Sequence, residues 1–172
     1  QGIVKQVSLE LISKARELAA PLNEKVGAVL VGHNVENLAA SLIAQGADKI
    51  YLAEHALLEY FLPIPYKKVI SALVNQFRPQ IMLFGASPLG RELAPRVAYS
   101  SDAGLTADCT KLEIEDFKKG NLELVGILKQ TRPALGGNIM ATIMTKDSQT
   151  QMATVRPGVM KALRPDLKRV GE

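Results

Sequence analysis

The chain contains one cysteine, two histidines and no tryptophan among its 172 residues. A single cysteine, Cys109, excludes an internal disulfide and a cysteine-rich metal site. His33 and His55 have no cysteine or carboxylate at ligand spacing, so the sequence predicts no metal site. Aromatic residues make up only 5% of the chain and are not interleaved with basic ones. This pattern argues against a stacking platform for nucleic acid.

Long apolar runs are also missing, since none approaches the roughly 20 residues that a membrane-spanning helix needs. No secretory signal is visible, and the chain begins at Gln1, as a processed protein or an excised piece would. The expected compartment is therefore the cytoplasm. The net charge of +4 is too small to indicate a nucleic-acid partner.

The composition is that of an ordinary globular protein, with 47% apolar and 22% charged residues. In the first hundred residues, short apolar runs alternate with helical patterns. The first helix is expected to start at Ser8 as its N-cap and to end at Pro21 and Asn23. Strands are expected at 26–31, 48–53 and 80–84, and further helices at 35–45, at 65–77 and from Pro88 onward. This alternation predicts right-handed βαβ crossovers and a three-layer α/β fold around a parallel sheet.

After Gly104 the pattern changes from helical to alternating, which predicts mostly antiparallel strands. These strands are expected at 106–115, 121–129, 138–145 and 151–155. The connections at 118–121 and 146–150 are polar turns typical of hairpins. One domain is predicted for residues 1–159, followed by an exposed linker at 160–172.

The segment 131–143 combines an Arg-Pro corner at Arg132 with a Gly-Gly turn at Gly136 and Gly137. An arginine beside two glycines offers a fixed charge and bare backbone amides to an electron-rich or anionic group. Asn138 follows and could bind the edge of a ligand or stabilise the turn. The alternative interpretation is a hairpin turn in which Arg132 makes a structural ion pair.

A second candidate site is the loop from Gly85 to Arg91, where a predicted strand leads into a helix and a phosphate could bind. The alternative is structural: Ser87 caps the helix, Pro88 takes the first helical position, and Gly90 allows close packing.

Two further sets of charged or reactive residues favour structural interpretations. Arg91 and Arg96 flank Glu92, a spacing typical of a surface ion pair. Asp108 and Cys109 have no nearby histidine and lie in an apolar strand, which favours core packing over a catalytic pair. No catalytic residue set is predicted.

Four motifs together resemble a known family: R-P-A-L-G-G-N-I-M-A-T-I from Arg132, Q-M-A-T-V-R-P-G-V from Gln151, G-A-S-P-L-G-R-E-L-A-P-R-V-A from Gly85 and G-L-T-A-D-C-T from Gly104. In this order they resemble the α subunit of electron transfer flavoproteins. The R-P-A-L-G-G-N variant is similar to the flavin-based electron-bifurcating branch. The resemblance covers residues 7 to about 160.

The resemblance implies a Rossmann-like (adenine nucleotide alpha hydrolase-like) parallel sheet with added antiparallel strands. It also implies an electron carrier rather than an enzyme, paired with an electron transfer flavoprotein β subunit. Arg132, Gly136, Gly137 and Asn138 would contact the FAD that the β subunit binds. A unit charge about 4 Å from the flavin, at an effective dielectric constant of about 20, contributes about 4 kcal/mol before desolvation.

The implied electron source is NADH or an acyl-CoA-type, flavin-dependent dehydrogenase. In that family the α subunit opens with a strand before its first helix and ends with a mobile domain that binds FAD. Neither part is present in this chain, so the fragment alone is not expected to hold FAD. Two alternatives from other classes stay open: a stand-alone adenine-nucleotide-binding module using Gly85–Arg91, and an α/β scaffold without a ligand.

Overall fold

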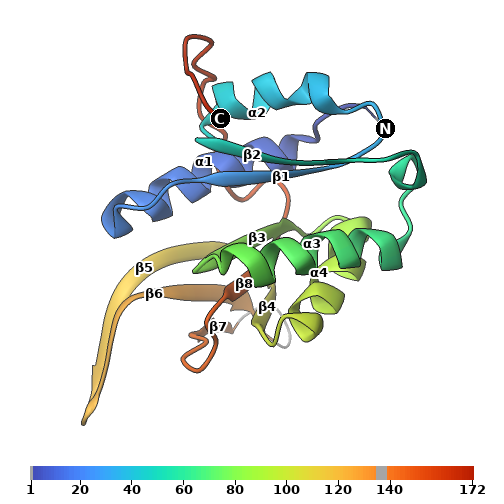
Figure 1. Cartoon of the computed structure of the whole chain (residues 1–172). Coiled ribbons are helices and arrows are strands. Elements are labelled where there is room, and N and C mark those ends of the chain that lie inside the picture. The colour runs from blue at the N-terminus through green and yellow to red at the C-terminus, as the bar shows by residue number, and fades with distance from the viewer. Residues whose placement is uncertain (1, 135–138) are drawn as a thin grey trace.

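The computed structural model describes residues 2–134 and 139–172. Its helices are α1 (Gln6–Leu22), α2 (Ala39–Gln45), α3 (Pro63–Phe77) and α4 (Pro88–Ser100), with short 3-10 turns η1 (Glu36–Leu38) and η2 (Ala56–Leu58). Its strands are β1 (Gly27–Gly32), β2 (Lys49–Glu54), β3 (Ile81–Gly85), β4 (Gly104–Cys109), β5 (Lys111–Lys119), β6 (Leu122–Pro133), β7 (Met140–Ile143) and β8 (Gln151–Val155). Figure 1 shows the parallel strands packed with helices, and the β5–β6 hairpin extending away from them.

The described strands form three sheets: a parallel β1–β2 pair, a parallel sheet in the order β3–β8–β4, and an antiparallel sheet in the order β5–β6–β7. The predicted α/β class, with added antiparallel strands, is confirmed. The last strand, β8, does not join the antiparallel strands but lies in the middle of the second parallel sheet. All five of its residues are buried, as expected for a central strand covered on both faces.

The core is built on both faces of β8. Met152 packs with residues of α3 and α4, including Val97, whereas Val155 packs with α1 and the antiparallel strands. Leu112 of β5 and Leu128 of β6 are fully buried in the second cluster. The antiparallel sheet is therefore anchored at its base, while its far end projects into solvent.

The first helix differs from the prediction at its start. Helix α1 begins at Gln6 after Lys5, so Ser8 lies inside the helix and the predicted N-cap is wrong. Pro21 lies in the last turn, and Asn23 ends the helix in a left-handed conformation with φ of 54°. Helix α3 likewise begins at Pro63 rather than at Pro65.

The segment predicted as one strand at 106–115 is two strands in two sheets. β4 ends at Cys109 as a parallel strand, and β5 begins at Lys111 as an antiparallel one. The pairing of β4 with β8 shifts register between Thr106 and Cys109, where Asp108 has a φ of 62°. Such a bulge bends a strand and redirects its side chains.

The two predicted polar turns have different outcomes. The turn at 118–121 is a hairpin, because Lys119 pairs with Leu122 across β5 and β6. The segment 146–150 is not a hairpin, because it carries the chain from the antiparallel sheet to the parallel one. On α4, Leu93, Val97 and Ala98 are buried, whereas Leu89 keeps 41% of its surface exposed.

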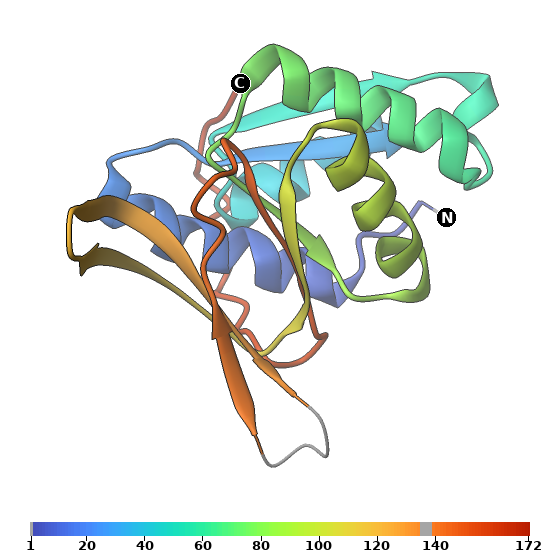
Figure 2. The same ribbon diagram turned by 90° about the horizontal axis from the view of Figure 1, so that it is seen from below.

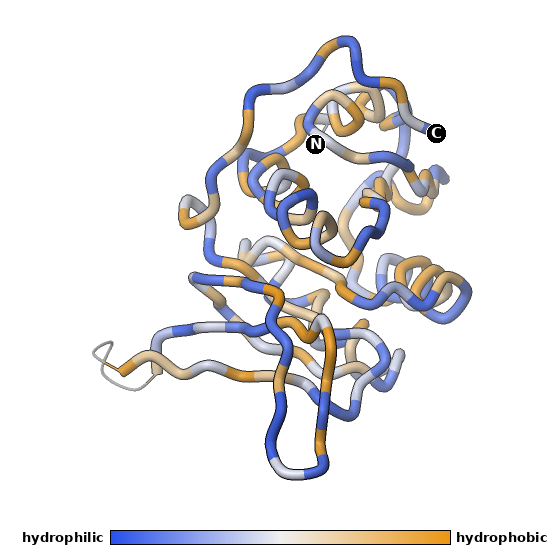
Figure 3. The backbone as a smooth tube through the Cα atoms, turned by 90° about the vertical axis from the view of Figure 1, so that its left-hand side faces the viewer, coloured by the Kyte–Doolittle hydropathy of each residue, from blue (hydrophilic) through white to orange (hydrophobic). Residues whose placement is uncertain are grey.

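Residues 160–172 are called the C-terminal strap here, because they run back along the outside of the domain (Figure 3). The N–H of Leu163 donates to Ser13 Oγ of α1, and the N–H of Asp166 donates to the carbonyl of Ala44 in α2. Glu172 exchanges backbone hydrogen bonds with Asp48 and Ile50 beside β2. The strap is thus tied to α1, α2 and β2 along its length.

In the part of the chain that the structure describes, no helix combines the length and apolar character needed to cross a membrane.

Candidate functional site

Arg132 is the second-last residue of β6, next to the segment that connects β6 to β7. It pairs with Ala141 of β7, and the backbone N–H of Ala134 donates to the carbonyl of Ile139 at 2.7 Å. Figure 2 shows the two strands projecting together from the rest of the protein. Gly136, Gly137 and Asn138 lie outside the described residues, so their predicted role stays a prediction.

The side chain of Arg132 is partly buried, and its Nε has no hydrogen-bond acceptor among the described residues. A buried N–H without an acceptor destabilises the folded state by about 1–3 kcal/mol. Among the described carboxylates, it is Asp108 whose pKa is lowered by the charge of Arg132. The ion pairs of Asp108, however, are with two other arginines, Arg91 and Arg156. The structural ion pair considered for Arg132 is therefore not seen among residues 2–134 and 139–172.

Asp108 binds arginines from two other elements. Arg156, which follows β8, donates from Nη2 to Oδ2 at 2.7 Å and from Nε to Oδ1 at 3.4 Å. Arg91 of α4 donates from Nη2 to Oδ1 at 3.1 Å. The hydrogen bond from Arg156 and the charges of all three arginines hold the pKa of Asp108 below its ordinary value, although burial opposes them. The site therefore contains three guanidinium groups and one carboxylate.

The elements bring this cluster together at one edge of the sheet. Arg91 follows β3, Asp108 is at the end of β4 and Arg156 follows β8. The three strands are parallel, so their carboxyl ends meet at the edge where ligands of open α/β sheets bind. Sequence reasoning missed the role of Asp108, because the residue lies in an otherwise apolar strand.

The Gly85–Arg91 loop has the features of the structural interpretation, in which Ser87 caps the helix, and not those of a phosphate-binding site. Ser87 caps α4 by accepting from the N–H of Gly90 at 3.2 Å, and Pro88 opens the helix. A Cβ added at Gly90 would lie 1.9 Å from the carbonyl oxygen of Gly85. The N–H groups of Ala86 and Arg91 also have acceptors, so these three amides are not free to cradle a phosphate.

Cys109 is fully buried, and burial raises the pKa of its thiol to about 11. Such a thiol is almost entirely protonated at neutral pH and is a poor nucleophile. This agrees with the core-packing interpretation for Cys109, whereas Asp108 does not pack in the core but pairs with Arg91 and Arg156. On the surface of α4, Arg96 Nη2 lies 3.3 Å from Glu92 Oε1, so these two residues form an ion pair.

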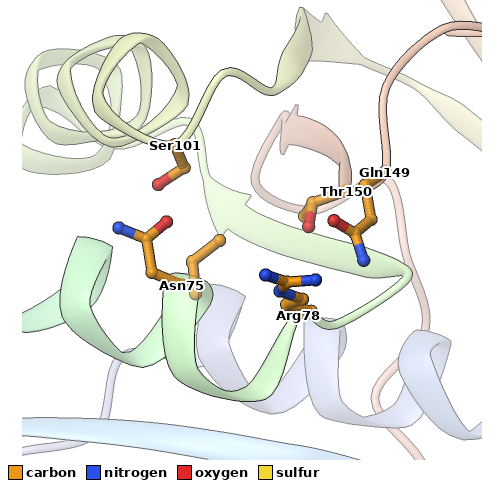
Figure 4. Close-up of a pocket in the computed structure, with 6 residues that line it drawn as sticks. Asn75, Arg78, Ser101, Gln149 and Thr150 are labelled. Atoms are coloured by element: carbon orange, nitrogen blue, oxygen red, sulfur yellow. The ribbon is translucent and has the colours of Figure 1, made fainter.

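A small polar cavity of about 240 Å³ lies at the other end of β8 (Figure 4). Arg78, Ser101 and Thr150 are among the residues that line it. Arg78 ends α3 and Ser101 ends α4, so two helix carboxyl ends face this region with their negative partial charge. Arg78 complements that charge, and the cavity is poorly suited to an anion.

No group of three or more potential metal ligands occurs among the residues that the structure describes. His55 caps η2 by accepting from the N–H of Leu57 at 3.1 Å.

Comparison with known proteins identifies a consistent set of relatives. The chain matches the electron transfer flavoprotein domain family over residues 1–172. It is 48% identical to electron transfer flavoprotein subunit alpha of Thermoanaerobacterium thermosaccharolyticum over 168 residues, which cover 97% of this chain and 48% of that protein. It is 45% identical to the same subunit of Megasphaera elsdenii over 172 residues, which cover 100% of this chain and 49% of that protein.

A further relative is the lactate dehydrogenase (NAD(+),ferredoxin) subunit LctC of Acetobacterium woodii. It is 43% identical over 162 residues, which cover 94% of this chain and 37% of that protein. The chain thus spans about half the length, or less, of these relatives.

Proposed function

Because this chain belongs to the electron transfer flavoprotein family, we propose that it is the amino-terminal, partner-binding part of an α subunit. It pairs with a β subunit, sets Arg132 against the FAD which that subunit binds, and tethers a mobile FAD domain. Electrons reach the complex from NADH or from an acyl-CoA-type dehydrogenase. The segment from Arg132 to Asn138 and the similarity to LctC favour the electron-bifurcating type.

The observation that carries this proposal is the buried Nε of Arg132, which has no acceptor among residues 2–134 and 139–172. A guanidinium always carries its charge, and Pro133 limits the backbone that follows it. The side chain is only partly buried, so its charge is available to an electron-rich partner outside the chain. The residues present therefore fit a flavin edge, and FAD, when bound, supplies the electron-transfer chemistry. Arg132 would contribute a positive charge at a fixed place, which favours additional electron density there.

The surface beside Arg132 suits a protein partner. β7 pairs with β6 on one side, and Ile139, Met140 and Ile143 keep 62%, 52% and 37% of their surfaces exposed. Exposed apolar side chains next to an open strand edge are typical of an interaction surface. We call these three residues the hairpin rim. The rim and Arg132 belong to one hairpin, so a subunit that covers the rim brings its flavin to the arginine.

The direct test is Arg132→Gln in the full-length α subunit assembled with its β subunit. The reduction potential of the β-side flavin is measured by spectroelectrochemistry. We expect a shift to more negative potential, because a positive charge that favours the reduced flavin is lost. Arg96→Gln is the matched control, since Arg96 pairs with Glu92 on the surface. An unchanged flavin potential in Arg132→Gln, with normal assembly and flavin content, would falsify the proposed role.

The stand-alone nucleotide-binding module has less support, because amides of the Gly85–Arg91 loop already have acceptors in the protein. Calorimetry with ATP and AMP separates the two functions. Micromolar binding to the isolated chain would favour the nucleotide module.

A further inference from the structure

The cluster around Asp108 contains more positive than negative charge. Arg91, Arg132 and Arg156 contribute three cations, and Asp108 contributes one anion. Arg91 and Arg156 keep 58% and 45% of their side-chain surfaces exposed, whereas Asp108 keeps 19%. The carboxylate is therefore the inner member of the cluster.

The backbone of β4 is distorted where it presents this carboxylate. Asp108 has a φ of 62°, a left-handed conformation that is uncommon outside glycine and that Asn and Asp tolerate best. The register shift in the pairing of β4 with β8 occurs at the same place. The N–H of Asp108 donates to Thr154 Oγ1 of β8 at 2.8 Å, which holds the distortion.

Backbone hydrogen bonds connect this distortion to Arg132. The N–H of Thr110 donates to the carbonyl of Thr131 at 2.8 Å, and Thr131 directly precedes Arg132. On the other side, the N–H of Arg156 donates to the carbonyl of Cys109 at 3.0 Å. Asp108 thus lies between two arginine-bearing segments, and its position relative to Arg132 is set by backbone contacts rather than by flexible side chains alone.

We propose that Asp108 is a positioning residue for Arg132: it binds Arg91 and Arg156, reduces the positive charge of the site, and leaves the Arg132 guanidinium to the flavin. This inference rests on the proposed function. Without the carboxylate, three like charges would repel each other, and the field at the flavin would become more positive. In this scheme Asp108 does not contact the flavin; it acts by holding two of the arginines and by offsetting part of their positive charge.

The test compares Asp108→Asn with Arg91→Gln in the full-length α subunit assembled with its β subunit. Asn has nearly the same shape and tolerates the left-handed conformation, so β4 keeps its path. We expect the potential of the β-side flavin to become more positive in Asp108→Asn, because a negative charge is removed. It should become more negative in Arg91→Gln, because a positive charge is removed. Opposite shifts from two residues that contact each other are not expected from a general loosening of the fold.

Asp48→Asn is the matched control. Asp48 also binds two arginines, Arg16 and Arg169, but on the far side of the domain beside β2. The flavin potential should not change in this variant. Circular dichroism and the flavin content of each complex establish that the variants are folded and loaded.

The outcomes separate this inference from the proposed function. If Arg132→Gln lowers the flavin potential but Asp108→Asn leaves it unchanged or lowers it, the role of Asp108 is wrong and that of Arg132 stands. If Arg132→Gln has no effect, the proposed function itself fails. Shifts of the same sign in Asp108→Asn and Arg91→Gln would also overturn the inference.

Discussion

Arg169 donates a hydrogen bond from its guanidinium to the carboxylate of Asp48, which lies 121 residues earlier in the chain. The other carboxylate oxygen of Asp48 accepts from Arg16 at 2.7 Å and from the N–H of Val26 at 2.8 Å. One side chain therefore joins α1, the start of β1 and the C-terminal strap. If the strap leads to a mobile domain, the place where the strap is last attached to this domain lies beside β2 and not at the end of β8.

The first prediction concerns this attachment. Asp48→Asn keeps an acceptor for Val26 but removes the charge that both arginines bind. Hydrogen bonds to charged groups stabilise by about 1.5–3 kcal/mol, so amide hydrogen exchange in the strap should become about tenfold faster or more. Lys49→Gln is the control, because its pair with Glu172 of the strap is exposed and screened by solvent, so its loss should affect exchange much less. Equal exchange rates in the two variants would contradict the role of Asp48.

The second prediction concerns pH. Burial raises the pKa of Asp48, but the N–H of Val26 and the two arginines outweigh it, so the net pKa is lowered. The pKa of Asp108 is also lowered, mainly by the hydrogen bond from Arg156. A carboxylate with a lowered folded-state pKa stabilises the fold above its ordinary pKa of about 4, and that stability is lost as the pH falls through the lowered value.

The urea concentration at the midpoint of unfolding should therefore decrease as the pH is lowered from about 5 to about 3. Asp108→Asn should show a smaller fall than the unaltered chain, because one titrating group is gone. A fall of the same size would show that Asp108 does not contribute to the acid sensitivity.

The third prediction concerns the turn between β3 and α4. In Gly90→Ala, the new methyl group would lie 1.9 Å from the carbonyl oxygen of Gly85, so the backbone must move. We expect a loss of about 1–3 kcal/mol in the free energy of unfolding. Leu89→Ala, one residue earlier and 41% exposed, should change it by no more than about 0.5 kcal/mol. The comparison is made by chemical denaturation, and equal losses would argue against the close packing of Gly90.

The sequence predicted the first half of the fold well, because short apolar runs between turn residues are a local signal. Its errors there are shifts of two to four residues at helix starts: at Ser8, at Pro65, and at the helix expected from residue 35, where the 3-10 turn η1 precedes α2. The second half was harder, since an alternating pattern does not tell which sheet a strand joins. The break near Thr110 and the central place of β8 depend on contacts between distant segments.

The candidate site was predictable only in part. The Arg132 segment stands out by its local composition, and the helix-capping role of Ser87 follows from its position before Pro88. Asp108 and Asp48 carry no such signal, because their arginine partners are far away in the sequence. The buried Glu10 is a similar case: it is buried because it accepts from the N–H of Gly158, 148 residues later.

The last prediction concerns the hairpin rim. Ile143→Lys adds a charge to β7 at a side chain that is already 37% exposed, so the isolated domain should keep its stability within about 0.5 kcal/mol. If the β subunit covers the rim, burial of that charge without a partner should weaken assembly by tenfold or more, as measured by titration of labelled β subunit. Val125→Lys provides the control, because Val125 is 77% exposed on β6, well before Arg132 in the strand. Weakened binding in Val125→Lys alone would move the interface to the outer part of the β5–β6 hairpin. Unchanged binding in Ile143→Lys would remove the rim from the interface, and with it the reason that a partner-bound flavin should lie near Arg132.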